Sequence, residues 1–178
     1  MNSIIKDILL SDKKHKEKVS ILTKRIIEDD KLIDDLFDLL KTGNDVEKGT
    51  SAEVMKFVSK EKPELMKSYI DTLIEYINYK APRVKWGAPE SIGNLAQIYP
   101  KEVEKAIPNL LKNTKEKSTV VRWCAAFALT EIAKYNSNKQ GELIPIFDNL
   151  IKSEQNNGVK NLYIKTLKAI EKNKKIKG

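Results

Sequence analysis

The sequence repeats a nine-residue pattern four times. The four segments begin at Val46, Val84, Val121 and Val159, which are 38, 37 and 38 residues apart. Each has an apolar residue eight positions after its valine and another three positions later, giving the columns Val54, Ile92, Leu129, Leu167 and Phe57, Leu95, Ile132, Ile170. Offsets of eight and eleven return to one face of an α-helix. A period near 38 residues is typical of solenoids built from two-helix repeats.

Small side chains lie between these apolar columns. Gly49, Gly87 and Cys124 share one position, and each is followed by another small residue (Thr50, Ala88, Ala125). Such residues allow neighbouring helices to approach closely. Leu162 and Tyr163 replace them in the fourth segment, which we interpret as a terminal repeat with no further helix against it.

An amphipathic segment precedes each of the four, so each repeat is predicted to be a helical hairpin. These first helices are expected at 31–41, 63–78, 101–113 and 139–152, with turns at 43–45, 80–82, 116–118 and 155–158. Two further apolar-periodic segments, 2–10 and 14–29, are predicted to cap the stack. The chain is therefore predicted to be all-α and to form a single domain, residues 1–178, with N-terminal capping helices in 1–30 and repeats at 31–60, 63–99, 101–135 and 138–173.

Two stretches of the third repeat resemble the helices of a HEAT repeat. These are residues 106–111 (AIPNLL) and 120–133 (VVRWCAAFALTEIA). The family pattern has a proline in the first helix, matched by Pro108 and Pro145, and a Val-Arg dipeptide in the second, matched best by Val121–Arg122. The resemblance covers residues 31–172. It implies a right-handed α-α superhelix (solenoid) of about four hairpins, of the armadillo type, whose second helices line a concave face.

Signals for metal, nucleotide or nucleophilic chemistry are almost absent. His15 is the single histidine and Cys124 the single cysteine, so zinc-ligand spacings and an internal disulfide are excluded. Lys and Glu surround His15, which favours a solvated position, and Cys124 falls in the small-residue column. No glycine-rich phosphate-binding motif occurs. We expect no cofactor, no metal and no catalytic residue.

Charge and hydropathy give broader expectations. The net charge of +8 favours a polyanionic partner only if the cations cluster on one face. No apolar run approaches the ~20 residues of a membrane span, so we expect a cytoplasmic protein with no membrane contact. The oligomeric state and the identity of the partner do not follow from the sequence.

The second helices supply the candidate binding residues. The residue after each valine is Glu47, Lys85, Arg122 or Lys160, and the next is Lys48, Trp86, Trp123 or Asn161. Four residues beyond the tryptophans lie Glu90 and Phe127, on the same helix face. We predict a concave-face site comprising Lys48, Lys85, Trp86, Glu90, Arg122, Trp123, Phe127 and Lys160. Two interpretations of the tryptophans stay open: exposed anchors in an aromatic and basic groove, or half-buried residues that seal the seam between repeats.

Two functional hypotheses follow. The first is a non-catalytic scaffold that presents its concave face to a protein or peptide. The second is a nucleic-acid-binding relative, including the HEAT-like alkylpurine DNA glycosylases, which the resemblance matches at Trp86, Glu90 and Arg122. That family has Asp where this chain has Glu90, and the chain is shorter than those enzymes.

Pro89 leaves two local geometries open. The second helix either continues through it, losing the hydrogen bond to the Lys85 carbonyl, or begins there after a separate turn. In both cases Trp86 lies next to irregular backbone.

Overall fold

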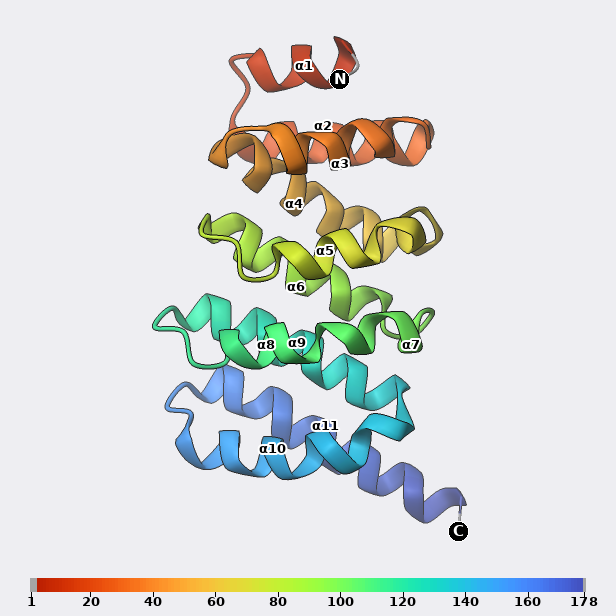
Figure 1. The fold of residues 1–178 in the computed structure, drawn as a ribbon, viewed down its shortest axis with the longest axis vertical. Coiled ribbons are helices and arrows are strands. Elements are labelled where there is room, and N and C mark those ends of the chain that lie inside the picture. The colour runs from red at the N-terminus through yellow and green to blue at the C-terminus, as the bar shows by residue number, and fades with distance from the viewer. Residues whose placement is uncertain (1–2, 178) are drawn as a thin grey trace.

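Helices account for most of the chain in a computed structural model of the protein, which describes residues 3–177. No strand occurs in that range. Two N-terminal helices are followed by four hairpins stacked as a ladder (Figure 1). In chain order the elements are α1 (Ser3–Leu10), α2 (His15–Glu28), α3 (Leu32–Thr42), α4 (Asp45–Glu61), η1 (Pro63–Tyr69), α5 (Ile70–Tyr76), α6 (Pro82–Leu95), α7 (Pro100–Val103), η2 (Glu104–Ala106), α8 (Ile107–Asn113), α9 (Thr119–Tyr135), η3 (Ser137–Lys139), α10 (Gln140–Ser153) and α11 (Asn157–Lys177). The predicted all-α solenoid is confirmed.

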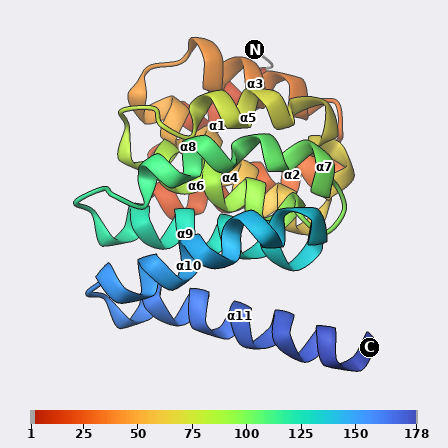
Figure 2. The same cartoon turned by 60° about the horizontal axis from the view of Figure 1, so that its bottom comes forward.

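The helices form two layers. An outer layer (α3, α5, α8 and α10) faces the viewer in Figure 1, and an inner layer (α2, α4, α6, α9 and α11) packs behind it. Figure 2 shows α11 lying along the C-terminal end of the stack. One continuous apolar core runs between the layers, from Ile5 to Ile170.

Local sequence explains where the hairpins turn. Asn44 caps α4 by accepting hydrogen bonds from the amides of Val46 and Glu47, and the Glu47 carboxylate accepts one from the Asn44 amide in return. Ser118 caps α9. Pro82 opens α6 and Pro100 opens α7, at positions where the missing N–H costs nothing.

Prolines also break or bend helices. The continuous helix predicted for residues 101–113 is instead α7, η2 and α8, because Pro108 has no N–H to donate to the Glu104 carbonyl and the tighter turn of η2 precedes it. Helix α6, in contrast, continues through Pro89, so the first of the two geometries considered for that proline is the one adopted.

The register of the first repeat differs from our alignment by one residue. Val84, Val121 and Val159 are buried, whereas Val46 is 67% exposed. Because α4, α6 and α9 begin at Asp45, Pro82 and Thr119, the residue equivalent to the other valines is Glu47, whose side chain belongs to the α4 cap. The same shift makes Val58 the core residue and leaves Phe57 38% exposed. The prediction that Val46 and Phe57 share the buried columns was wrong.

Small residues bring the inner helices together. A Cβ placed on Gly87 of α6 would collide with the backbone carbonyl of Ala52 on α4, and one on Gly93 would lie 2.6 Å from the Phe127 ring on α9. The inner helices therefore approach one another closely. In the outer layer a groove of about 540 Å³ opens between α8 and α10.

Candidate functional site

Each inner helix leaves one line of side chains that does not pack into the core. We call these lines together the inner stripe. On the two central helices the line is continuous at helical spacing, with Arg83, Trp86, Glu90 and Asn94 on α6 and Val120, Trp123, Phe127 and Glu131 on α9. It continues through Ile27 on α2, Glu53 and Phe57 on α4, and Asn161 and Lys165 on α11.

An aromatic pair lies at the centre of the stripe. Trp123 is 37% exposed and stacks on Phe127, with the ring centroids 5.7 Å apart and the planes nearly parallel at 3°. Phe127 sits over Gly93 of the neighbouring helix, where a larger residue would displace it. The pair is therefore held in place from below while the Trp123 ring stays open to solvent.

Trp86 has a different environment from Trp123. It is half-buried, and its indole N–H is buried without a hydrogen-bond partner. It lines a hollow of about 450 Å³ with Pro82 and Arg83. Within residues 3–177 the ring that stacks on Trp123 is Phe127 and not Trp86. Trp123 thus has the geometry of an exposed residue, and Trp86 that of a seam residue.

The predicted cations lie at an edge of the stack rather than on the stripe. In the corrected register Lys48, Lys85, Arg122 and Lys160 share one position. Lys48 donates to the Leu40 carbonyl at 2.7 Å and lies over the Tyr79 ring of the next hairpin. Lys85 of the second hairpin pairs with Glu116, which lies in the turn between α8 and α9 of the third hairpin. Glu47, aligned with these cations from the sequence, belongs one position earlier.

Arg122 makes the most extensive of these contacts. Its Nε lies 2.8 Å from Glu154 Oε2, and its Nη1 donates to the carbonyls of Glu116 and Lys117. The guanidinium holds the pKa of Glu154 below its usual range, and the hydrogen bond to Glu154 raises the pKa of Arg122. Lys48, Lys85 and Arg122 therefore each join their own hairpin to the turn of the next one. For Lys160, in the last hairpin, no ion pair occurs within residues 3–177.

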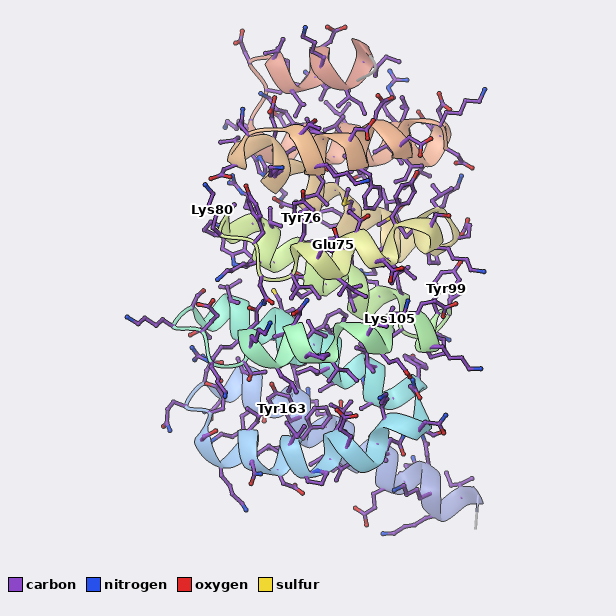
Figure 3. The ribbon with its side chains drawn as sticks, viewed as in Figure 1. Glu75, Tyr76, Lys80, Tyr99, Lys105 and Tyr163 are labelled. Atoms are coloured by element: carbon purple, nitrogen blue, oxygen red, sulfur yellow. The ribbon has the colours of Figure 1, made fainter. Side chains whose placement is uncertain are left out.

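Further contacts hold the same edge together. Figure 3 shows Tyr76 and Lys80 near the turn between α5 and α6. Lys80 pairs with Asp45 at 3.3 Å, and the Tyr79 hydroxyl donates to Asp45 at 2.8 Å. The hydrogen bond from Tyr79 lowers the pKa of Asp45. These contacts join α4 to the following hairpin.

Glu90 is also engaged. Its carboxylate lies 3.7 Å from Lys56 Nζ, and the Cys124 thiol donates to it at 3.5 Å. Burial raises the pKa of that thiol, so Cys124 is a packing residue. Trp86, Glu90 and Arg122 are the positions matched to the glycosylases. Because Arg122 points to the edge of the stack, where it contacts Glu154, these three side chains do not surround one open cleft.

A groove of about 710 Å³ between α2 and α4 was not predicted from the sequence. Its apolar side chains are Val19 and Ile27 from α2 and Phe57 from α4. Charged side chains of both signs also line it (Lys16, Lys24, Glu28, Glu53 and Glu61). Sequence reasoning placed Phe57 in the core and treated α2 as a cap. One feature of the sequence could have indicated that Phe57 is exposed. Val58, the apolar residue next to it, is able to take the core position and does so.

Among residues 3–177 no helix combines the length and apolar character needed to cross a bilayer. The same residues contain no group of three His, Cys, Asp or Glu side chains arranged to hold a metal ion.

Comparison with known proteins identifies structural relatives only. No protein-family model matches the chain, and no curated protein matches it in sequence. A designed armadillo repeat protein, solved in complex with the peptide (KR)4, superposes with a TM-score of 0.73 at 18% identity, over 93% of this chain and 79% of its own. An engineered protein gives a TM-score of 0.74 at 18% identity, over 94% and 78% of the two chains. Computationally designed armadillo repeat proteins for modular peptide recognition give 0.72 at 18%, over 93% and 80%.

Proposed function

Because this chain has the fold of the armadillo- and HEAT-type repeat superhelices, we propose that it is a non-catalytic scaffold that holds a segment of a partner protein along the inner stripe. The observation that carries the proposal is the Trp123–Phe127 pair, an exposed aromatic surface at the centre of the inner stripe. Aromatic side chains on a rigid support are the usual anchors of protein interfaces. Two of the structural relatives are described as binding or recognising peptides, which supports the same reading.

Charge on the stripe supports a protein partner over a nucleic acid. Glu53, Glu90 and Glu131 interrupt its cations, whereas a phosphate backbone favours an unbroken basic surface. The edge cations Lys48, Lys85 and Arg122 have partners within the protein. We therefore expect labelled DNA, single- or double-stranded, to show no binding even at low salt.

The test is selection of peptides on the whole protein. A displayed library of random peptides is panned against the full chain, and enriched sequences are synthesised and titrated by fluorescence anisotropy. Trp123→Ser should weaken their binding about tenfold or more. Ile98→Ser serves as the matched control, because Ile98 is also an exposed apolar residue, 52% exposed, but lies at the α6–α7 turn, and it should leave binding unchanged.

Two results would refute the scaffold proposal. One is a library from which no peptide is enriched, and the other is a set of enriched peptides that Trp123→Ser and Ile98→Ser affect equally. Far-ultraviolet circular dichroism of each variant shows whether a loss of binding reflects a loss of fold.

A further inference from the structure

The apolar groove and the charges of the inner stripe specify a partner more narrowly. We infer that the stripe takes an acidic segment with one bulky apolar side chain, which enters the α2–α4 groove while the carboxylates reach the lysines of α11. This inference rests on the proposed function and adds the chemistry and the spacing of the bound segment.

The groove provides an apolar site that no other segment of residues 3–177 fills. Phe57 is exposed although Val58 beside it is fully buried, so the phenyl ring contributes little to the core. Lys56 Nζ lies 4.8 Å from the centre of that ring, which supports one of its faces. Burying a leucine or phenylalanine side chain between Phe57, Val19 and Ile27 is worth about 1.5–3 kcal/mol, enough to fix the register of a bound chain.

The acidic residues of the stripe are already neutralised. Glu53 lies 2.7 Å from His15 and 3.8 Å from Arg83. Glu90 pairs with Lys56 and Glu131 with Lys134. A basic segment would have to displace Arg83, Lys56 and Lys134 before it could form ion pairs of its own. The stripe is therefore poorly suited to a peptide such as the (KR)4 bound by the designed relative.

The cations toward the C-terminal end are, in contrast, available. Lys165, Lys168 and Lys172 are exposed along α11, and no ion pair involves them within residues 3–177. They recur at spacings of three and four residues, so they share one side of the helix. Three unpaired ammonium groups on one side attract carboxylates. The inner layer therefore has an apolar end at α2–α4 and a basic end at α11.

The stacking distance sets the length of the segment between these ends. The path from α4 to α11 crosses α6 and α9, which makes three helix-to-helix steps of about 8–10 Å each. An extended chain covers about 3.3 Å per residue, so about seven to nine residues separate the apolar side chain from the acidic cluster. The Trp123–Phe127 pair lies along this path and contacts the middle of the segment.

The probe is a labelled synthetic peptide with one phenylalanine, a Gly-Ser spacer of about eight residues and a cluster of glutamates, made in both chain directions. One control peptide replaces the phenylalanine with serine, and another replaces the glutamates with lysines. Titration against the full chain by anisotropy should give at least about tenfold tighter binding for the acidic phenylalanine peptide than for either control.

Variants assign the two ends separately. Phe57→Ser should abolish the preference for phenylalanine over serine, and Ile98→Ser should retain it. The pair Lys165→Gln/Lys168→Gln should weaken binding and flatten its dependence on salt. The pair Lys101→Gln/Lys152→Gln, which removes two exposed lysines from the outer layer, should do neither.

The inference is overturned if the lysine peptide binds as well as the glutamate peptide, if no probe binds, or if Phe57→Ser leaves the preference intact. In those cases the library selection separates the two proposals. If the enriched peptides have another chemistry but their binding still depends on Trp123, the scaffold proposal holds and the acidic partner is refuted. A selection that enriches nothing removes both.

Discussion

The contact between Arg122 and Glu154 gives the sharpest prediction about stability. The pair joins the third hairpin to the turn of the fourth, and the side chains are 18% and 7% exposed. Removing one member of a buried pair leaves the other charge unpaired, which costs about 3–5 kcal/mol. Because water still reaches part of Arg122, we expect Arg122→Gln and Glu154→Gln each to lower the free energy of unfolding by about 2–4 kcal/mol.

The assay is urea unfolding of the full chain followed by far-ultraviolet circular dichroism. The double variant should be less destabilised than the sum of the two single variants, because both remove the same contact. Lys105→Gln is the matched control. Lys105 pairs with Asp71 at 3.1 Å across the second and third hairpins, but the two side chains are largely exposed, so its loss should cost under about 1 kcal/mol. An Arg122→Gln effect as small as that of Lys105→Gln would refute the reasoning.

The same pair predicts a pH dependence of definite sign. Arg122 lowers the pKa of Glu154 in the folded protein, so the contribution of the ion pair is fully present above the unfolded pKa of about 4.3. It is lost as the pH falls through the lower folded value. The stability difference between the native protein and Glu154→Gln should therefore be constant near neutral pH and shrink below about pH 4. A difference that grows on acidification would contradict this assignment.

Three further predictions concern packing. Val121→Ala should cost about 2 kcal/mol in urea unfolding and Val46→Ala under about 0.5, since only the first valine is buried; equal effects would contradict the corrected register. Gly87→Ala should destabilise the protein by about 1–3 kcal/mol, because the added methyl group would collide with α4. Gly141→Ala should not destabilise it, because the space around Gly141 is open. A Gly87→Ala protein as stable as the native one would argue against the close approach of the inner helices. Cys124 should resist a thiol reagent until the chain unfolds, because burial raises its pKa; rapid labelling of the folded protein would show that this seam is open.

The sequence was sufficient to predict the type of fold because the signal is repeated. The three buried valines, the small residues of α6 and α9 and the helix-opening prolines each agree across copies. The first repeat was misplaced by one residue because Val46 and Phe57 are apolar neighbours of the true core positions. Apolar character alone does not separate a buried residue from an adjacent exposed one. Asn44 and Glu47 have the spacing of a helix N-terminal capping box, and this pattern would have predicted the correct start of α4.

The candidate site was less predictable. Helical spacing placed Trp123 and Phe127 on one face, and the structure has them stacked. Spacing did not reveal that Lys48, Lys85 and Arg122 turn toward the edge, because their partners lie in the turns of the following hairpins, about 31–32 residues away. The α2–α4 groove also depends on how two separate helices pack, and no local pattern encodes that distance.

The most direct test of the inner stripe as the binding surface uses the two tryptophans, the only ones in the chain. Their indole N–H groups give two resonances in a nitrogen-15 correlation spectrum, and one Trp123→Phe variant assigns both. On titration with a peptide from the library selection, the Trp123 signal should move and saturate with the measured affinity, and the signal of the buried Trp86 N–H should move less. A peptide that binds to saturation while the Trp123 resonance stays unchanged would place the binding surface elsewhere and contradict the account.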